Sequence, residues 1–455
     1  MPSIAAKHEH QITARSPKVR RRWGEQSFAV VAMLVFAGAG WPLLAGANSP
    51  ESLLLPSKSV PELRLVTYPI YTVVIGLTIS HAKRIVPLFR ENWILLFLVA
   101  LAFVSSAWSA DPALTFRRSA VLAVTTAFAL YLVSRFAPAE IMKLVVLSFG
   151  IAGMSSLLFV LVDPSLAIEV DERGAALRGV FVQKNVFGEF MLFGGAAALI
   201  LAASRTHRAG IYYLLVYFLA MALTVLSNSV TYIVIGFLLI PVVVIAVIKR
   251  RVSRLHFGMT GIVAFAIILL LSVTLASDPD TVLGLLARDR TLTGRTEVWQ
   301  AVWEYIQMRF WLGYGYGAFW DGWMAPGHDI RMLIGAYPHA HNGWLDLWLS
   351  LGAIGVAFMA ASFLGALCRT IRNFGRGDEV TTLISVVFLI AILLLTPVEN
   401  GLLIQNSSTW VLYAIASASA NSAARHHRNQ RASKPLGQSK PVKSLASAPP
   451  TKKRL

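Results

Sequence analysis

The sequence predicts an all-α polytopic membrane protein with about twelve transmembrane helices and a long extracytoplasmic loop that contains amphipathic helices. Of the 455 residues, 56% are hydrophobic and only 14% are charged, whereas a soluble domain carries about a quarter charged residues. Apolar runs of 16 to 25 residues recur along the chain, a length that spans a bilayer as a helix. A helix is favoured because it satisfies its own backbone hydrogen bonds in lipid.

The apolar runs divide the chain into five parts. A basic tail (1–26) precedes nine spans within 27–277, a large loop follows (278–341), three spans lie within 342–420, and a disordered basic tail ends the chain (421–455). The predicted spans are 27–46, 66–81, 93–109, 119–134, 144–162, 186–203, 211–227, 229–248, 259–277, 342–366, 380–397 and 405–420.

The positive charge follows the predicted spans. The net charge is +18, and 29 of the 41 Lys and Arg residues fall on one side of the membrane if alternate links are assigned to alternate sides. This is the positive-inside pattern, so we expect both termini to be cytoplasmic. The pattern favours a topology signal over nucleic-acid binding, and no nucleic-acid partner is expected.

Two extracytoplasmic segments are longer than the other links, and long loops in compact proteins tend to be functional. The first is 163–185, which carries Arg178, Lys184 and Asn185 near its end, and the second is 278–341. The second loop has no lysine and five arginines, namely Arg288, Arg290, Arg295, Arg309 and Arg331.

The arginine cluster at 288–295 favours an anionic ligand, because the guanidinium fork binds phosphate oxygens in pairs. The alternative is that arginines of this loop pair with Asp289, Glu297, Glu304 and Asp329 at a wet surface. We favour this alternative for Arg309 and Arg331.

The stretch after the cluster predicts an amphipathic helix over 296–310. Its apolar residues, from Val298 to Phe310, recur at helical spacing on one face. That face suits either the membrane interface or packing on the transmembrane bundle. The glycine-rich segment 311–320 (WLGYGYGAFW) follows, and we interpret it as a tight turn with aromatic residues at the membrane interface.

The loop ends with His339, His341 and Asn342 just before a span. Two histidines could ligate a metal, but no third ligand is evident, and a general-base role for a histidine beside the arginines is favoured. Glu399, between the last two spans, should have a partner or a role because it lies so close to the bilayer. A single cysteine, Cys368, excludes intramolecular disulfides.

Several of these stretches together resemble the O-antigen ligase and polymerase superfamily, in its exopolysaccharide-polymerase branch. The matching stretches are LRGVFVQKNVFGEF (177–190), LSNSVTY (226–232), RDRTLTGRTEVW (288–299), LGYGYGAFW (312–320), PHAHNGWLDLWLSLGAIG (338–355) and TPVENGLL (396–403). They occur in the family order, with the long extracytoplasmic loop in the expected place.

The resemblance implies a metal-independent glycosyltransferase of the bacterial inner membrane, with no cofactor, that polymerises undecaprenyl-diphosphate-linked repeat units at the periplasmic face. It implies that Arg178 and Arg295 bind the diphosphate and that His341 acts as the base. The residues expected to contact substrate are Arg288, Arg290, Lys184, Asn185, His339, Asn342 and Glu399. Expected partners are the lipid-linked glycan, the bilayer, and a chain-length regulator and flippase of the same pathway.

Two other functions compete with the polymerase. An O-antigen ligase would use the same donor and transfer its glycan to lipid A core. A transporter or flippase for an anionic lipid-linked glycan would place charged or helix-breaking residues at mid-bilayer in matched halves. Here the arginines gather in one outer loop and no internal repeat is evident, which disfavours transport.

Overall fold

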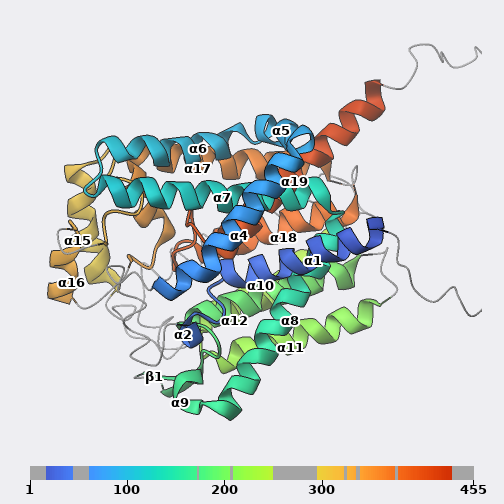
Figure 1. Cartoon of the computed structure of the whole chain (residues 1–455), viewed down its shortest axis with the longest axis horizontal. Helices are drawn as coiled ribbons and strands as arrows, with labels where there is room; N and C mark the ends of the chain where they lie inside the picture. Colours follow the sequence, from blue (N-terminus) through green and yellow to red (C-terminus); the bar gives the residue numbers. More distant parts are fainter. Residues whose placement is uncertain are drawn as a thin grey trace, which may run out of the picture.

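The computed structural model describes residues 17–44, 61–171, 174–204, 209–248, 295–321, 325–334, 339–374 and 378–432. Long helices lie side by side along the molecule, with α15 (Arg295–Met308) and α16 (His328–Ile334) across one end (Figure 1). α1 (Pro17–Phe36) begins and α19 (Ser408–Ala432) ends at the opposite end (Figure 1). The predicted span 259–277 lies outside the described residues, and so do Arg288 and Arg290.

The all-α membrane fold is confirmed. By length and composition, six described helices can cross a membrane, or seven if the bent pair α5–α6 forms one span. The count of twelve spans therefore stays a prediction. The remaining bundle helices are α4 (Pro61–Ser80), α5 (Ala82–Glu91), α6 (Trp93–Val104), α7 (Pro112–Arg135), α8 (Pro138–Val162), α10 (Lys184–Ala203), α11 (Gly210–Leu226), α12 (Val230–Ile248), α17 (Gly343–Asn373) and α18 (Glu379–Leu395).

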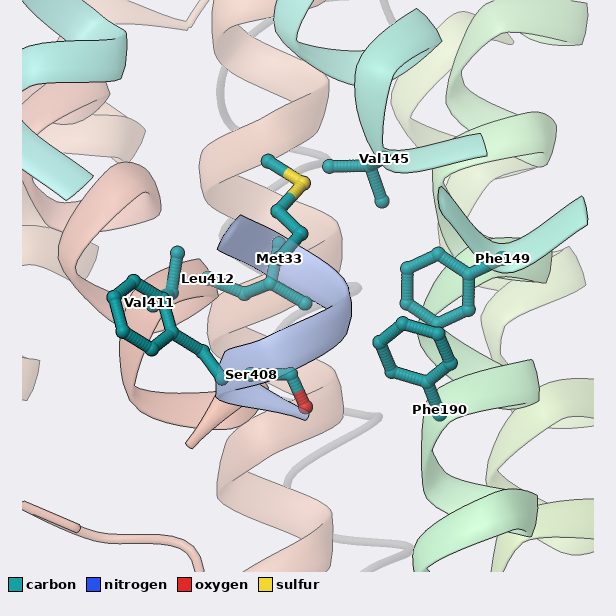
Figure 2. A pocket seen from close by; sticks show the side chains of 8 residues that line it. Met33, Val145, Phe149, Phe190, Ser408, Val411 and Leu412 are labelled. Atoms are coloured by element: carbon teal, nitrogen blue, oxygen red, sulfur yellow. The ribbon is translucent and has the colours of Figure 1, made fainter. Parts of the chain in front are cut away.

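Helix α10 lies at the centre of the bundle, where it contacts α8, α11, α12 and α18. Small residues allow this close approach: a Cβ at Gly194 would overlap the ring of Phe149. The rings of Phe149 and Phe190 stack with centroids 3.7 Å apart. Figure 2 shows these rings beside Met33 and Val411, where the apolar gap holds only about 10 Å³. The interior is therefore closely packed there and leaves no room for a glycan.

The polar stretch after α4 differs from the short link expected from the sequence. It forms helix α5, which meets α6 at 90°. Ile85 and Leu88 are buried on one side of α5, while Lys83, Arg84 and Arg90 are exposed. This segregation makes α5 an amphipathic helix of the kind that lies along a membrane surface.

The segment 163–185, which is predicted to be extracytoplasmic, also contains structure that hydropathy did not predict. A short helix α9 (Pro164–Ala167) leads into an antiparallel hairpin of β1 (Ile168–Asp171) and β2 (Gly174–Leu177). Asp163 caps α9 by accepting hydrogen bonds from the Ser165 hydroxyl and the Leu166 N–H, and these bonds lower the pKa of its carboxyl. Lys184 and Asn185 lie in the first turn of α10 instead of in the loop.

The glycine-rich segment 311–320 is a buried connector, and the predicted location of its aromatic residues at the membrane interface is wrong for most of them. Tyr314, Tyr316, Phe319 and Trp320 are at most 9% exposed, whereas Trp311 is 67% exposed. The Tyr314 N–H donates to the Leu349 carbonyl (2.7 Å), next to the kink that Gly352 introduces in α17 at φ 65°. Gly313, Gly315 and Gly317 also have positive φ, which permits the close packing of this segment.

Helix α15 packs on the bundle through the apolar face expected from the sequence. Val298, Val302 and Ile306 are buried against Phe319 and Leu349. Of the two interpretations left open, packing against the bundle therefore describes this face. Trp303 is 41% exposed and lies edge-on to Trp348 of α17.

Candidate active site

The amino end of α17 is fixed against the turn that follows α18. The Gly343 N–H donates to the carbonyls of Thr396 (2.8 Å) and Glu399 (3.1 Å). Asn342 caps the helix, because its side-chain oxygen accepts from the N–H groups of Trp344 and Leu345. These bonds bring the segment before α17 into contact with Glu399, which lies far away in the sequence.

His341 faces a buried carboxylate. Its Nδ1 lies 3.3 Å from Oε2 of Glu399, whose side chain is 7% exposed. The other oxygen, Oε1, accepts from the side-chain amide Nδ2 of Asn185 at 3.3 Å. The side-chain oxygen Oδ1 of Asn185 in turn accepts from the Ser229 hydroxyl at 3.1 Å. A continuous chain of polar contacts thus connects His341, Glu399, Asn185 and Ser229. Of the predicted site residues, the structure brings His341, Glu399 and Asn185 together.

This arrangement indicates which ring nitrogen of His341 carries the hydrogen in the neutral ring. A carboxylate only accepts hydrogen bonds, so Nδ1 facing Glu399 carries the hydrogen in the neutral ring. Nε2 then keeps its lone pair. The histidine side chain is 16% exposed, so a hydroxyl group of another molecule can still reach the ring. A histidine oriented by a carboxylate in this way can act as a general base.

The backbone that carries His341 is held in an unusual conformation. Its φ is 49°, in the left-handed region that costs a non-glycine residue about 1–2 kcal/mol. The His341 N–H donates to Nδ1 of His339 at 3.2 Å, and the two rings lie 4.2 Å apart. His339 therefore shapes the backbone at His341. Such strain is often found at functional sites.

Asp346, near the start of α17, holds Ala340, the residue that precedes His341. Its oxygens accept from the Ala340 N–H at 3.0 and 3.2 Å, and Oδ1 also accepts from the Trp320 indole at 2.8 Å. The Ala340 carbonyl accepts from the indole of Trp299 in α15 at 2.7 Å. Both backbone polar groups of Ala340 are thus fixed, and α15 is connected to the residue next to His341.

Arg295 begins α15, one turn before Trp299, so the helix places it at the end of the molecule that holds His341. The chemistry of this position is suited to an anion, because the amino end of a helix also favours negative charge.

Arg178 follows the β1–β2 hairpin and is 7% exposed. Its Nε donates to the Leu166 carbonyl at 2.8 Å. Burial lowers the pKa of the guanidinium, and the nearby Glu169 opposes the shift; an arginine nonetheless stays charged. Glu169 also accepts from the backbone N–H of Lys184 at 2.8 Å. The hairpin is therefore joined to the start of α10, whose next residue, Asn185, contacts Glu399.

Arg309 has a structural role, as expected, and within the described part of the chain its contacts are with a carbonyl and an aromatic ring instead of an acidic residue. Its guanidinium donates to the Trp108 carbonyl at 3.2 Å and lies 4.9 Å from the centroid of the Tyr314 ring. The same connector is held by Arg118 of α7, which pairs with Asp321 and donates to the Gly317 carbonyl. Burial raises the pKa of Asp321, and Arg118 is the strongest of the charges that oppose this rise.

Sequence analysis missed Ser229, Glu189 and Asp346. Glu189 lies inside α10 and hydrogen-bonds Thr409 of α19. A signal for Glu189 and Asp346 was available, since a lone acidic residue within an apolar span usually has a partner or a function. Ser229 carries no such signal, because a serine at a helix start is common. Within the described ranges, no group of three or more His, Cys, Asp or Glu residues could hold a metal ion.

Residues 190–360 match a family model described as O-antigen ligase. The match confirms the resemblance to the O-antigen ligase and polymerase superfamily over this segment. It includes Arg295 and His341, and it ends before Glu399 and begins after Asn185. No curated protein gives a significant match to the chain. The family match supports a multi-pass membrane protein with a glycosyl-transferring activity of the ligase or polymerase type.

Proposed function

We propose that this enzyme, related over residues 190–360 to O-antigen ligases, polymerises undecaprenyl-diphosphate-linked repeat units into an exported polysaccharide at the periplasmic face. The observation that carries the proposal is the contact between Nδ1 of His341 and the buried Glu399 carboxylate (3.3 Å). This contact supports Nε2 as the base, at the end of the molecule where α15 and the β-hairpin supply arginines.

The proposed reaction is one displacement at the anomeric carbon of the donor glycan. A hydroxyl oxygen of the acceptor glycan forms the new bond to this carbon, and its proton passes to Nε2 of His341. The bond from the same carbon to the lipid diphosphate breaks, and the diphosphate leaves with the electron pair. Because the attacking and leaving oxygens occupy opposite sides of the carbon, inversion is expected.

The arginines stabilise the charge that develops on the leaving diphosphate. Placed cations contribute most where water is partly excluded, and Arg178 is in such a place because it is 7% exposed. We assign the same role to Arg295, and weaker donor contacts to Arg288, Arg290 and Lys184. The donor supplies its own good leaving group, so no metal or cofactor is required by this chemistry.

The matched family description favours a second candidate of the same chemistry, an O-antigen ligase. Its acceptor would be lipid A core instead of a second lipid-linked glycan. Incubating purified enzyme with lipid-linked repeat units alone separates the two. A polymerase forms a ladder of longer chains on a gel, whereas a ligase forms none until lipid A core is added.

The base is tested by His341→Ala with His339→Ala as the matched control. We expect His341→Ala to lower turnover about 10²–10⁴-fold while lipid-linked donor still binds. His339→Ala should have a smaller effect, because the bond from the His341 N–H to His339 acts on the backbone and not on the proposed base itself. EDTA should leave turnover unchanged. If chelation stops the reaction and added divalent metal restores it, a His339/His341 metal site replaces the general-base assignment.

A further inference from the structure

A cleft of about 1090 Å³ lies at the end of the molecule opposite His341. Helix α7 connects the two ends: Arg118 near its start holds the connector at 317–321, and Arg135 at its end lines the cleft. The 17 residue steps from Arg118 to Arg135 correspond to about 25 Å of helix. The cleft is therefore nearly a bilayer thickness away from the proposed active site.

Charged side chains from α1, α5, α7 and α8 line this cleft, and two ion pairs use its acidic groups. Arg22 of α1 pairs with Glu140 of α8, and Arg135 of α7 pairs with Glu25 of α1. Glu25 also accepts from the Tyr131 hydroxyl at 3.2 Å. Both carboxylates that line the cleft, those of Glu25 and Glu140, are therefore already in ion pairs.

Two cations of the cleft remain uncompensated. Lys83 and Arg84 lie in the first turn of α5, both are exposed, and neither forms an ion pair with an acidic residue in the described part of the chain. Adjacent cations beside a cleft whose acids are already paired attract an anion, and Arg84 can bind phosphate oxygens through its planar fork. A negatively charged ligand would offset the repulsion between the adjacent side chains of Lys83 and Arg84.

The neighbouring surfaces place the cleft at the depth of lipid headgroups. Helix α5 meets α6 at 90° and buries only its apolar side, as a helix at a membrane surface does. Directly before it, α4 exposes Ile79 (70%) and Ile75 (47%), which are four residues apart and lie on one side of the helix. An apolar face of this kind suits acyl chains, and Trp23, which is 54% exposed in the cleft, suits the interface.

We propose that this cleft binds the phosphate headgroup of an anionic phospholipid in the leaflet opposite the active site. Lys83 and Arg84 contact the phosphate oxygens, and the acyl chains lie along the exposed face of α4. Free phosphate offers the same charge without the apolar contacts, so it should bind far more weakly. In the orientation expected from the Lys and Arg distribution, this leaflet is the cytoplasmic one, which is rich in anionic lipid.

The full chain, purified in detergent, can be titrated with phosphatidylglycerol and separately with phosphatidylcholine while native mass spectrometry counts bound lipid. A double variant, Lys83→Gln with Arg84→Gln, should weaken phosphatidylglycerol binding about 30-fold, since each basic residue near a membrane surface contributes about fivefold. Arg90→Gln is the matched control, because Arg90 is exposed on the same helix but does not line the cleft. It should bind within about twofold of the unmodified chain.

A Lys83→Arg, Arg84→Lys variant retains both charges and should bind nearly as well, which separates charge from misfolding. The proposal is overturned if the double glutamine variant binds phosphatidylglycerol normally, or if Arg90→Gln loses as much. It is also overturned if phosphatidylcholine binds equally tightly, or if inorganic phosphate at equal concentration displaces the lipid. None of these measurements depends on the glycosyltransferase activity.

Discussion

Glu399 uses both of its carboxylate oxygens within the protein, one for His341 and one for Asn185. The sequence analysis expected Glu399 and Asn185 to contact substrate. Their mutual contacts favour a different use, in which Asn185 positions Glu399 and Glu399 orients the histidine ring. In the proposed reaction, a carboxylate at this distance would also stabilise the imidazolium form of His341.

Replacing Glu399 by glutamine tests this role. The amide can accept from Nδ1–H through its oxygen, but it lacks the charge that stabilises the imidazolium. We expect turnover to fall about 10²-fold or more, with donor binding nearly unchanged. Turnover and donor binding of the purified variant are measured side by side, and Asn185→Ala should give a smaller loss in the same direction. Weakened donor binding with normal turnover of bound donor would instead make Glu399 a substrate ligand.

The donor-binding role of Arg295 is tested with two variants, one that removes its charge and one that keeps the charge but changes the shape of the side chain. Arg295→Ala should abolish polymer while the protein remains in the membrane. Arg295→Lys should restore little, because an ammonium group does not reproduce the paired hydrogen bonds of a guanidinium. Arg309→Ala is the control, since Arg309 contacts Trp108 and Tyr314 within the protein. Normal polymer from Arg295→Ala would contradict the donor-binding role.

At the scale of elements, buried polar contacts of the connector 311–320 and of the residues on either side of it join α15 to α7 and α17. Tyr316 donates to the Leu403 carbonyl at 2.7 Å, and the Thr115 hydroxyl donates to the Tyr316 carbonyl at 3.0 Å. The end of the connector supplies Trp320, which holds Asp346. A disturbance of the connector is therefore expected to reach the segment that carries His341.

The pair of Arg118 and Asp321 gives this connector a pH dependence. Burial already raises the pKa of Asp321, and Arg118 opposes the rise, so Arg118→Met should raise the pKa further above its unfolded value of about 3.9. The contribution of the neutral Asp321 carboxyl to the folding stability of the variant is then fully present below about pH 4 and is lost as pH rises through the folded pKa.

Thermal unfolding in detergent at pH 5 and pH 8 measures this effect. We expect Arg118→Met to be about 1–3 kcal/mol less stable than the parent at pH 8, with a smaller deficit at pH 5. Arg117→Met is the control, because Arg117 is exposed and makes a smaller contribution at Asp321. An equal deficit at both pH values would show that the buried carboxyl is not the cause.

At the scale of the whole molecule, the start of α1 and the end of α19 lie where we expect them if both termini are on one side of the membrane. α1 begins and α19 ends at the same end of the bundle (Figure 1), and the Lys and Arg distribution predicts that this side is cytoplasmic. Alkaline phosphatase fused after residue 300 should be active, and fusions after residues 252 and 430 should be inactive. Enzyme activity and fusion abundance are measured together, and an active fusion at residue 252 would reverse the orientation.

Hydropathy predicted the helical bundle well because each span carries its own signal. It did not predict α5 or the β1–β2 hairpin, since short amphipathic pieces lie below the length that a bilayer imposes. The resemblance predicts His341 and Arg178 as site residues, but the contact between His341 and Glu399 depends on how the turn after α18 meets the start of α17. Sequence separation gives no information on such a contact, and the same holds for Asn185 with Ser229.

The capped start of α17 has a consequence for how a diphosphate is recognised. Many phosphate-binding proteins use the free N–H groups at the first turn of a helix as a rigid cradle. Here the N–H groups of Gly343, Trp344 and Leu345 are all occupied by protein oxygens. The amino end of α17 therefore offers no backbone cradle, so in the proposed site the diphosphate is bound chiefly by the side chains of Arg178 and Arg295. Recognition of the donor should for this reason be adaptable in shape, tolerant of different glycans, and highly sensitive to the loss of a single guanidinium.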